Sequence, residues 1–203
     1  MDIKAKMSEI LRAESAAIAN IPVTDGYAQA VELIVRRVHE GGAKLVTSGM
    51  GKCGQIAENI ATTFSSTGIP AVFLHPAEAQ HGDLGVVQRG DVLMLLSNSG
   101  RTSEIVALVE LAHNLYADLP IIVITGNADS PLSALADVCL LTGNAPEVCP
   151  LGLTPTTSTT CMTVIGDVLV VACMEATGFT VKDYALRHHG GYLGQKSRGE
   201  CDR

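Results

Sequence analysis

Leu95-Leu96-Ser97-Asn98-Ser99-Gly100-Arg101-Thr102-Ser103-Glu104 is the stretch that decides the fold. Residues 92–96 are apolar throughout, as in a buried strand, and residues 105–112 are apolar at helical spacing. The hydroxyl and amide side chains therefore lie where a strand turns into a helix. Free backbone N–H groups and the positive end of the helix dipole make such a turn an anion site. A hydroxyl-rich helix cap without a ligand is the alternative interpretation.

The same change of periodicity recurs along the chain. It predicts strands at 44–48, 70–74, 91–96, 120–124 and 137–142. It predicts helices at 3–19, from about residue 24 to Gly41, and at 55–66, 102–116, 131–136 and 158–177. Because strands and helices alternate and the strands are apolar throughout, the expected fold is α/β, with a parallel sheet covered on both faces.

Size and composition fit one globular domain. The chain has 203 residues, of which 47% are hydrophobic and 17% are charged, enough to build a buried core. We divide this domain into N-terminal helices (1–42), an αβα core (43–177) and a C-terminal segment (178–203).

Charge and cysteine usage narrow the class of protein. A net charge of −7 without a cluster of lysines and arginines argues against nucleic-acid binding. No uninterrupted apolar window reaches transmembrane length, and residues 1–20 lack the apolar core of a signal peptide. Six cysteines without a CxxC pair indicate reduced thiols. We therefore expect a cytoplasmic protein with neither a nucleic-acid nor a membrane partner.

Four polar loops follow predicted strands, at 48–54, 75–83, 97–104 and 125–130. In an open parallel sheet, ligands bind outside the carboxyl ends of the strands. The four loops are therefore expected to form one site.

The first loop matches the dinucleotide fingerprint letter for letter, as Gly49-x-Gly51-x-x-Gly54. That interpretation requires an acidic residue at the end of the second strand, where this chain has His75-Pro76. The Walker A pattern also fails, because Lys52 is followed by Cys53 rather than by Ser or Thr. The loop instead suits a small phosphorylated or hydroxylated ligand.

The second loop concentrates His75, Glu78, His81 and Asp83. Imidazole and carboxylate groups are zinc ligands, but this spacing is not a standard metal pattern. We favour hydrogen bonding to sugar hydroxyls, and a loop tied by its own side chains is the alternative.

Three further features lie in the C-terminal half. Glu147 follows the last predicted strand, where a lone glutamate is usually only solvated. Residues 155–160 place five hydroxyl groups at the start of the long helix, either as a cap or as a second polar wall of the site. His188 and His189 form a pair beside a flexible glycine turn.

Taken together, these segments resemble the sugar isomerase (SIS) domain family, and within it the arabinose-5-phosphate isomerases. The resemblance runs from about residue 45 to 194, and its most specific parts are 75–85 and 149–160. The matching pieces include Gly49-x-Gly51-Lys52-x-Gly54, Ser66-Thr67-Gly68, His75-Pro76-Ala77-Glu78-Ala79-x-His81-Gly82-Asp83-Leu84-Gly85, Ser97-Asn98-Ser99-Gly100, Cys149-Pro150-Leu151-Gly152-Leu153, Pro155-Thr156-x-Ser158-Thr159-Thr160 and His188-x-Gly190-Gly191.

The resemblance implies a three-layer αβα sandwich, doubly wound and flavodoxin-like, with a five-stranded parallel sheet. It implies a reversible isomerase between D-ribulose 5-phosphate and D-arabinose 5-phosphate that feeds synthesis of Kdo, the acid sugar of bacterial lipopolysaccharide. The family's catalytic positions fall on Lys52, Glu104, Glu147 and His188. Substrate contacts are expected at Ser48, Gly49, Gly51, Gly68, His75, His81, Ser97, Asn98, Ser99, Thr102, Ser103, Thr157 and Ser158.

Aldose–ketose exchange moves a proton between C1 and C2 through an enediol, and it needs no metal or redox cofactor. It needs a base and a group that stabilises the enediolate oxygen. We expect Glu147 to carry the proton, Lys52 to offset charge, His188 to assist ring opening and Glu104 to orient hydroxyls, with the two glutamates interchangeable in role. Residues 97–103 would hold the phosphate, and excess zinc would inhibit at His75.

Many family members carry a pair of CBS modules after this domain, and none precedes Arg203. We therefore expect a short form, in which a Kdo-derived product would compete at the active site itself. His189 stands where the family usually has proline. Apolar surface on the long helix and the N-terminal helices predicts a homotetramer in which His188 could serve a neighbouring subunit. The alternatives are a non-catalytic sugar-phosphate sensor and an isomerase of a hexulose or heptulose phosphate.

Overall fold

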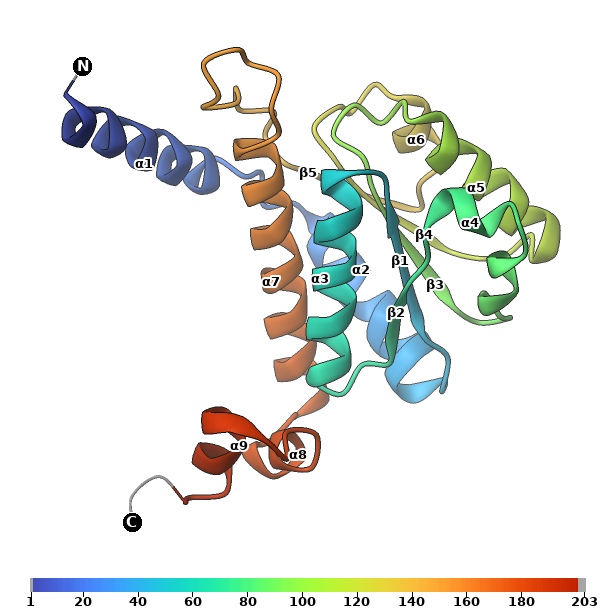
Figure 1. The fold of residues 1–203 in the computed structure, drawn as a ribbon. Coiled ribbons are helices and arrows are strands. Elements are labelled where there is room, and N and C mark those ends of the chain that lie inside the picture. The colour runs from blue at the N-terminus through green and yellow to red at the C-terminus, as the bar shows by residue number, and fades with distance from the viewer. Residues whose placement is uncertain (1, 201–203) are drawn as a thin grey trace.

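The five predicted strands form one parallel sheet in the computed structural model, which describes residues 2–200. Their order is β2-β1-β3-β4-β5, so the sheet is the expected doubly wound one, with its switch point between β1 and β3 (Figure 1). The strands are β1 (Leu45–Gly49), β2 (Ala71–Phe73), β3 (Val92–Leu96), β4 (Ile121–Thr125) and β5 (Val138–Leu141).

Helices cover both faces of the sheet, as expected for this class (Figure 1). They are α1 (Ile3–Ala19), α2 (Asp25–Ile34), α3 (Lys52–Ser66), α4 (Pro76–Ala79), α5 (Ser103–Leu115), α6 (Pro131–Ala134), α7 (Thr157–Thr177), α8 (Val181–Ala185) and α9 (Gly191–Ser197). A π-helical segment, Val35–Glu40, continues α2, and a 3₁₀ turn, Asp83–Val86, follows α4.

Two details differ from the sequence-based expectation. Helix α3 begins at Lys52 rather than at residue 55, so the glycine loop is shorter and Lys52 lies in the first helical turn. In the C-terminal segment, for which no helix was predicted, helix α9 forms around Gly194, which is buried.

Alternate side chains of each central strand enter different cores. In β3, Met94 and Leu96 pack with residues of α2, α3 and α7, whereas Leu93 and Leu95 pack with residues of α5 and α6. Strands buried on both faces are mostly apolar, which is why they read as hydrophobic runs. The buried hydroxyls of Thr47 and Ser48 in β1 donate to the carbonyl oxygens of Ala57 and Leu74.

Helix α7 is long and apolar enough to cross a membrane by length and composition alone. Its apolar run is interrupted by Asp167, so it is not an uninterrupted apolar window. Half of that stretch is buried inside the protein, where α7 lies along α3 (Figure 1). A core helix of a globular domain passes the same test, and the packing of α7 is of that kind.

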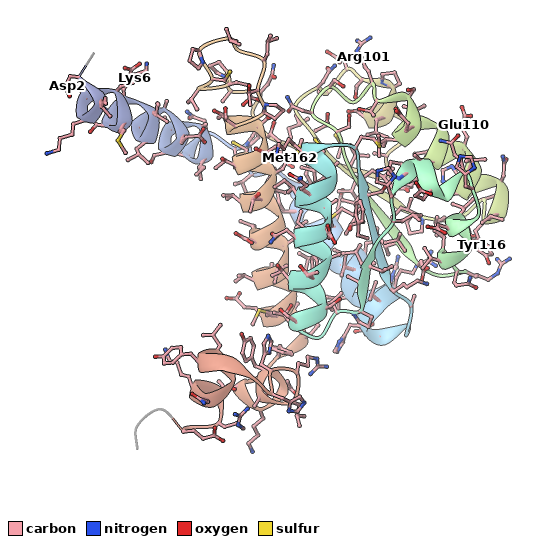
Figure 2. All side chains as sticks on the ribbon, in the orientation of Figure 1. Asp2, Lys6, Arg101, Glu110, Tyr116 and Met162 are labelled. Atoms are coloured by element: carbon pink, nitrogen blue, oxygen red, sulfur yellow. The ribbon has the colours of Figure 1, made fainter. Side chains whose placement is uncertain are left out.

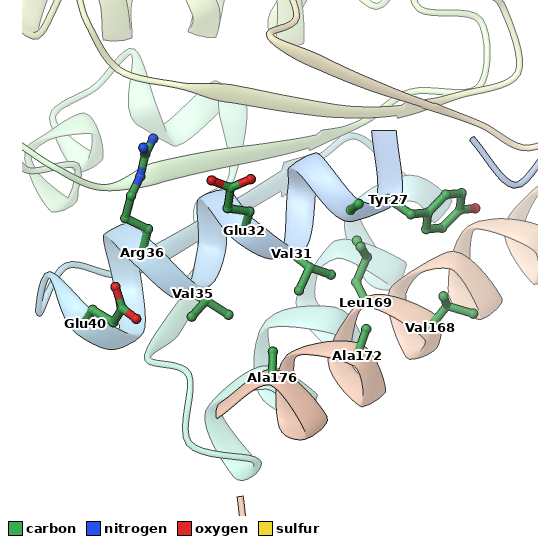
Figure 3. A pocket seen from close by; sticks show the side chains of 11 residues that line it. Tyr27, Val31, Glu32, Val35, Arg36, Glu40, Val168, Leu169, Ala172 and Ala176 are labelled. Atoms are coloured by element: carbon green, nitrogen blue, oxygen red, sulfur yellow. The ribbon is translucent and has the colours of Figure 1, made fainter. Parts of the chain in front are cut away.

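Helix α1 projects from the layered body on the outer side of α7, and α8 and α9 lie beyond the C-terminal end of α7 (Figure 1). A groove of about 590 Å³ runs between α2 with its π-helical extension and α7, with an apolar wall that includes Val31, Val35 and Leu169 (Figure 3). Unpartnered apolar surface of this extent is typical of protein–protein contact. The exposed apolar side chains in and beside α1, α8 and α9 are Ile3, Met7, Leu11, Val181, Leu186, Tyr192 and Leu193.

The glycines that suggested a dinucleotide site have a packing role. A Cβ atom at Gly54 would lie 2.6 Å from the carbonyl oxygen of Gly49, and one at Gly49 would lie 2.7 Å from the backbone of Cys53. Helix α3 therefore starts in direct contact with the end of β1. Gly51 has a φ of 57°, which a glycine adopts without strain.

Gly54→Ala should destabilise the protein by about 1–3 kcal/mol, because the added methyl overpacks the α3–β1 contact by more than the gain in helix propensity. Denaturant unfolding measures the change. Gly85→Ala is the matched control, since a Cβ at Gly85 meets nothing within 4 Å. Equal stability of the two variants would contradict this account of the contact.

Candidate active site

The strand register brings the polar loops to one edge of the sheet. Gly49 pairs with Leu96, Leu96 pairs with Ile124, and the loops begin within two residues of these positions. The segments that start at Met50, Ser97 and Gly126 therefore leave the sheet side by side. The expected convergence of loops at the carboxyl edge is present.

The serine turn between β3 and α5 is held by its own hydroxyl groups. Ser97 Oγ lies 2.9 Å from Thr102 Oγ1 and accepts from the N–H of Gly100 at 3.2 Å. Ser99 Oγ accepts from the N–H of Arg101 at 3.2 Å. Gly100 has a φ of 64° and packs so closely on Ser130 that a Cβ would collide with it.

The hydroxyl groups of this turn differ in availability. Ser97 is buried, whereas Ser99 and Ser103 are exposed, and Arg101 points outward from the rim (Figure 2). Asn98 Oδ1 is buried with no hydrogen-bond partner among residues 2–200. The turn thus offers an exposed hydroxyl and an unsatisfied amide oxygen at one place.

Glu104 lies in the first turn of α5. Its own backbone N–H and the Ser103 hydroxyl, which donates to Oε2 at 2.9 Å, lower the pKa of Glu104. Its carboxylate is therefore ionised at neutral pH.

Lys52 and Ser48 flank the glycine loop and differ in their exposure to solvent. Lys52 is exposed at the start of α3, and its Nζ lies 3.3 Å from Gln55 Oε1. Ser48 is buried at the end of β1, and its hydroxyl donates to the carbonyl of Leu74 at 2.6 Å. The Ser48 hydroxyl thus ties two strand ends together, whereas Lys52 is available to a ligand.

Glu147 caps the start of α7. Its Oε2 accepts from the Thr156 N–H at 2.7 Å, the Thr156 hydroxyl at 2.9 Å and the Ser158 N–H at 3.3 Å. Partial burial alone would raise the pKa of Glu147, but the hydrogen bonds from Ser158 and Thr156 lower it overall. A half-buried, ionised carboxylate at a helix N-terminus is thus built into the site.

Cys53 shows that Glu147 and the serine turn share one region. Burial raises the pKa of the Cys53 thiol, hydrogen bonding with the Asn98 backbone lowers it, and the charge of Glu147 raises it further. Its Sγ also lies 3.8 Å from Sδ of Met162, in the first turns of α7 (Figure 2). The starts of α3 and α7 and the serine turn therefore meet around Cys53, next to Lys52.

His75 follows β2 at the same edge of the sheet. Its Nδ1 is buried with no hydrogen-bond partner among the described residues. His81 is exposed after α4. Between Asp2 and Glu200, the chain forms no group of three or more His, Cys, Asp or Glu side chains arranged to hold a metal ion.

The structure places two predicted site residues at the opposite end of the domain. Gly68 follows the far end of α3, where a Cβ would lie 3.0 Å from the ring of Phe179. His188 lies beside α8, whose place below α3 and α7 is visible in Figure 1. Within one chain, neither residue joins Lys52, Ser99 and Glu147.

The His188 ring is nevertheless held in a defined state. It stacks on Tyr184 with ring centroids 3.6 Å apart, and its Nδ1 lies 3.0 Å from the Tyr184 carbonyl oxygen. That hydrogen bond requires the proton on Nδ1, so Nε2 remains as the nitrogen open to a ligand.

Thr157 and Ser158 are both buried at the start of α7, where they serve the cap rather than an open wall. Sequence reasoning missed Thr156, which donates twice to Glu147. It also missed Glu14 of α1, whose Oε1 accepts from the Thr157 hydroxyl at 2.9 Å. The sequence offered one signal for Glu14, which is a carboxylate whose neighbouring positions on the helix are apolar.

A doubly wound parallel sheet with a hydroxyl-rich turn at its carboxyl edge defines an α/β domain with a candidate anion site at that turn. A family model described as SIS domain matches residues 41–172. The chain belongs to the SIS domain family.

Three relatives are informative. Arabinose 5-phosphate isomerase KdsD of Shigella flexneri is 52% identical over 153 residues, 75% of this chain and 46% of the relative. A Bacteroides fragilis structure assigned as a phosphosugar isomerase involved in capsule formation is 64% identical, with a TM-score of 0.92 over 94% of this chain and 99% of its own. Escherichia coli CFT073 c3406 in complex with A5P is 33% identical, with a TM-score of 0.85 over 92% and 97%. The chain spans about half the length of the curated relatives it matches.

Cys149, two residues after Glu147, should be the most acidic thiol in residues 2–200. The Thr154 hydroxyl and the backbone N–H groups of Leu153, Thr154 and Leu151 lower the pKa of Cys149 to about 6, whereas burial raises the pKa of Cys173 to about 12. Alkylation of Cys149 by iodoacetamide, followed by peptide mass spectrometry, should reach half its maximal rate near pH 6, because the thiolate is the nucleophile. Cys149→Ser should remove this fast phase. A midpoint in the ordinary thiol range above pH 8 would contradict the assigned hydrogen bonds.

Proposed function

We propose that this protein is an aldose–ketose isomerase that interconverts D-ribulose 5-phosphate and D-arabinose 5-phosphate. The observation that carries the proposal is the ionised, half-buried carboxylate of Glu147, beside the serine turn and the first turn of α3. Similarity to KdsD relatives and to a structure in complex with A5P, which we take as arabinose 5-phosphate, supports this substrate.

The site supplies the groups that an enediol mechanism needs. Glu147 would take the proton from one carbon and return it to the next, because a carboxylate held by three donors is ionised and fixed in orientation. Lys52 would offset negative charge on the enediolate oxygen or the phosphate. Glu104 would orient the sugar hydroxyls, and the two glutamates could exchange roles.

The phosphate would bind at the serine turn, where backbone N–H groups and the start of α5 favour an anion. Ser99 is the exposed hydroxyl of that turn, and His75 would contact the sugar from the end of β2. The reaction itself requires no metal or redox cofactor. Excess zinc bound at His75 would inhibit, and a Kdo-derived acid sugar would compete for the same anion site.

His188 lies far from this site within one chain, and an oligomer would account for that distance. We propose a homotetramer in which the α8–α9 segment of one subunit brings Nε2 of His188 to the site of a neighbour, where it would assist opening of the sugar ring. The apolar surfaces of α1, α7, α8 and α9 are the contact area that such an assembly requires. In this proposal the enzyme acts in the bacterial cytoplasm and serves Kdo and lipopolysaccharide synthesis.

Glu147→Gln and Lys52→Ala should each lower kcat by about a hundredfold or more, which is the range for one acid–base group.

Ser99→Ala should mainly raise KM, because its hydroxyl contributes to phosphate binding in the ground and transition states alike. A coupled assay with arabinose 5-phosphate, beside ribose, glucose and heptulose phosphates, measures these values. Tight binding without turnover would favour a sensor, and preference for another sugar phosphate would change the substrate.

Mixed oligomers test the shared site. A His188→Ala subunit retains Glu147, and a Glu147→Gln subunit retains His188, so one intact site forms where the two meet. Co-assembly of the two inactive variants should restore about a quarter of the wild-type activity in randomly paired dimeric units. Activity that stays at the level of the separate variants would place His188 in its own subunit's site or outside catalysis.

A further inference from the structure

Glu14 is a half-buried carboxylate whose place on α1 has no role in the mechanism above. Its Oε1 accepts a hydrogen bond from Thr157 Oγ1 at 2.9 Å, across 143 residues of sequence. Its Oε2 is buried without a hydrogen-bond partner among residues 2–200. A carboxylate removed from water in this way is costly to place, so its contacts are informative.

Thr157 connects Glu14 to the loop of Glu147. The Thr157 side chain is 1% exposed, and its hydroxyl also accepts from the N–H of Val148 at 3.2 Å. A hydroxyl has a single hydrogen, so donation to Glu14 leaves its lone pairs directed to Val148. The bonds form a chain from the Val148 N–H through Thr157 to Glu14, and each bond polarises the next.

The same loop is held from the other side by Glu147. Its Oε2 accepts from Thr156 and Ser158, the residues on either side of Thr157. Glu14 and Glu147 thus both accept hydrogen bonds from the first residues of α7. Both charges raise the pKa of the Cys161 thiol, after burial as the larger cause, which places both carboxylates near one point.

Apolar packing holds this loop weakly. Leu151 and Leu153, at its tip, are 76% and 79% exposed. The polar bonds of residues 147 and 148 to the start of α7 are therefore the main constraint on the orientation of the Glu147 carboxylate.

We propose that Glu14 is a positioning residue for Glu147, acting through Thr157 and the Val148 N–H. The proposal rests on the role of Glu147 as proton carrier. Glu14 touches neither substrate nor reacting atoms, and α1 becomes a working part of the site rather than a peripheral helix.

Glu14→Ala, measured in the assembled enzyme, should lower kcat by about tenfold to a hundredfold, because a misplaced base costs this much, and should leave KM within about twofold. Glu14→Gln is the matched control, since the amide oxygen still accepts from Thr157, and it should retain most of the activity. Thr157→Val should reproduce the loss, and the double variant Glu14→Ala/Thr157→Val should lose no more than either single variant.

The acid limb of the kcat profile separates positioning from general stability. The bonds at the start of α7 hold the pKa of Glu147 down, so loosening them should move the acid limb of Glu14→Ala to higher pH. The thiols of Cys53 and Cys161 lie near Glu147, and their raised pKa values keep them neutral. Cys149, two residues after Glu147, has a pKa lowered to about 6, so both profiles are measured in a Cys149→Ser background. Glu14 itself is removed by the substitution. A lower Tm with unchanged kcat and pH profile would overturn the proposal.

A failure of this inference is distinguishable from a failure of the proposed function. If Glu147→Gln is inactive while Glu14→Ala retains its kcat, the positioning role is wrong and the isomerase mechanism stands. If Glu147→Gln remains active, the proton carrier is another group, and the positioning role falls with it.

Discussion

Parallel pairing is the constraint on which this structure depends. Because the five strands run in one direction, every strand ends at the same edge, and the loops that follow must gather there. The close contact of Gly49 with Gly54 draws the start of α3 onto that edge. The start of α7 reaches the same place through the cap made by Glu147. The serine turn, Lys52 and Glu147 thus come to one edge although they lie far apart in sequence.

The electrostatics of the site follow from helix ends. Helices α3, α5 and α7 begin at this edge, and each start has backbone N–H groups without intrahelical partners. At α7 the donors belong to Glu147, which keeps that carboxylate ionised despite partial burial. At α5 the Glu104 carboxylate uses its own backbone N–H, and in the proposed function the start of this helix would bind the phosphate of the substrate. Helix starts would then anchor a protein carboxylate at α7 and bind a ligand at α5.

The strands of the sheet could be predicted from the sequence, because burial on both faces requires a run of mostly apolar residues. The sequence was insufficient where the cause of a structure is tertiary. Lys52 joins α3 because Gly51 and Gly54 permit a tight start, whereas glycines alone suggested a longer loop. Helix α9 forms around Gly194, whose missing Cβ leaves room for the carbonyl of His188.

The candidate site was predictable to the extent that loops after strands share an edge. Gly68 follows a helix and precedes β2, so chain direction places it at the other edge, which motif matching does not consider. His188 is remote for the same reason, because it follows the carboxyl end of α7. Glu14 had only a weak sequence signal, a carboxylate among apolar neighbours on its helix, because its partner Thr157 lies 143 residues away in sequence.

Helix α1 is hydrogen-bonded to the start of α7 through Glu14, in its C-terminal half. Its inner half is fixed through Glu14, and its outer half presents Ile3, Met7 and Leu11 to the surroundings. A surface that binds the outer half of α1 would also restrict motion of its inner half, because a helix bends and rotates as one unit. If the proposed oligomer forms through the outer half of α1, its formation would therefore also stabilise the position of Glu14 and of the loop that carries Glu147.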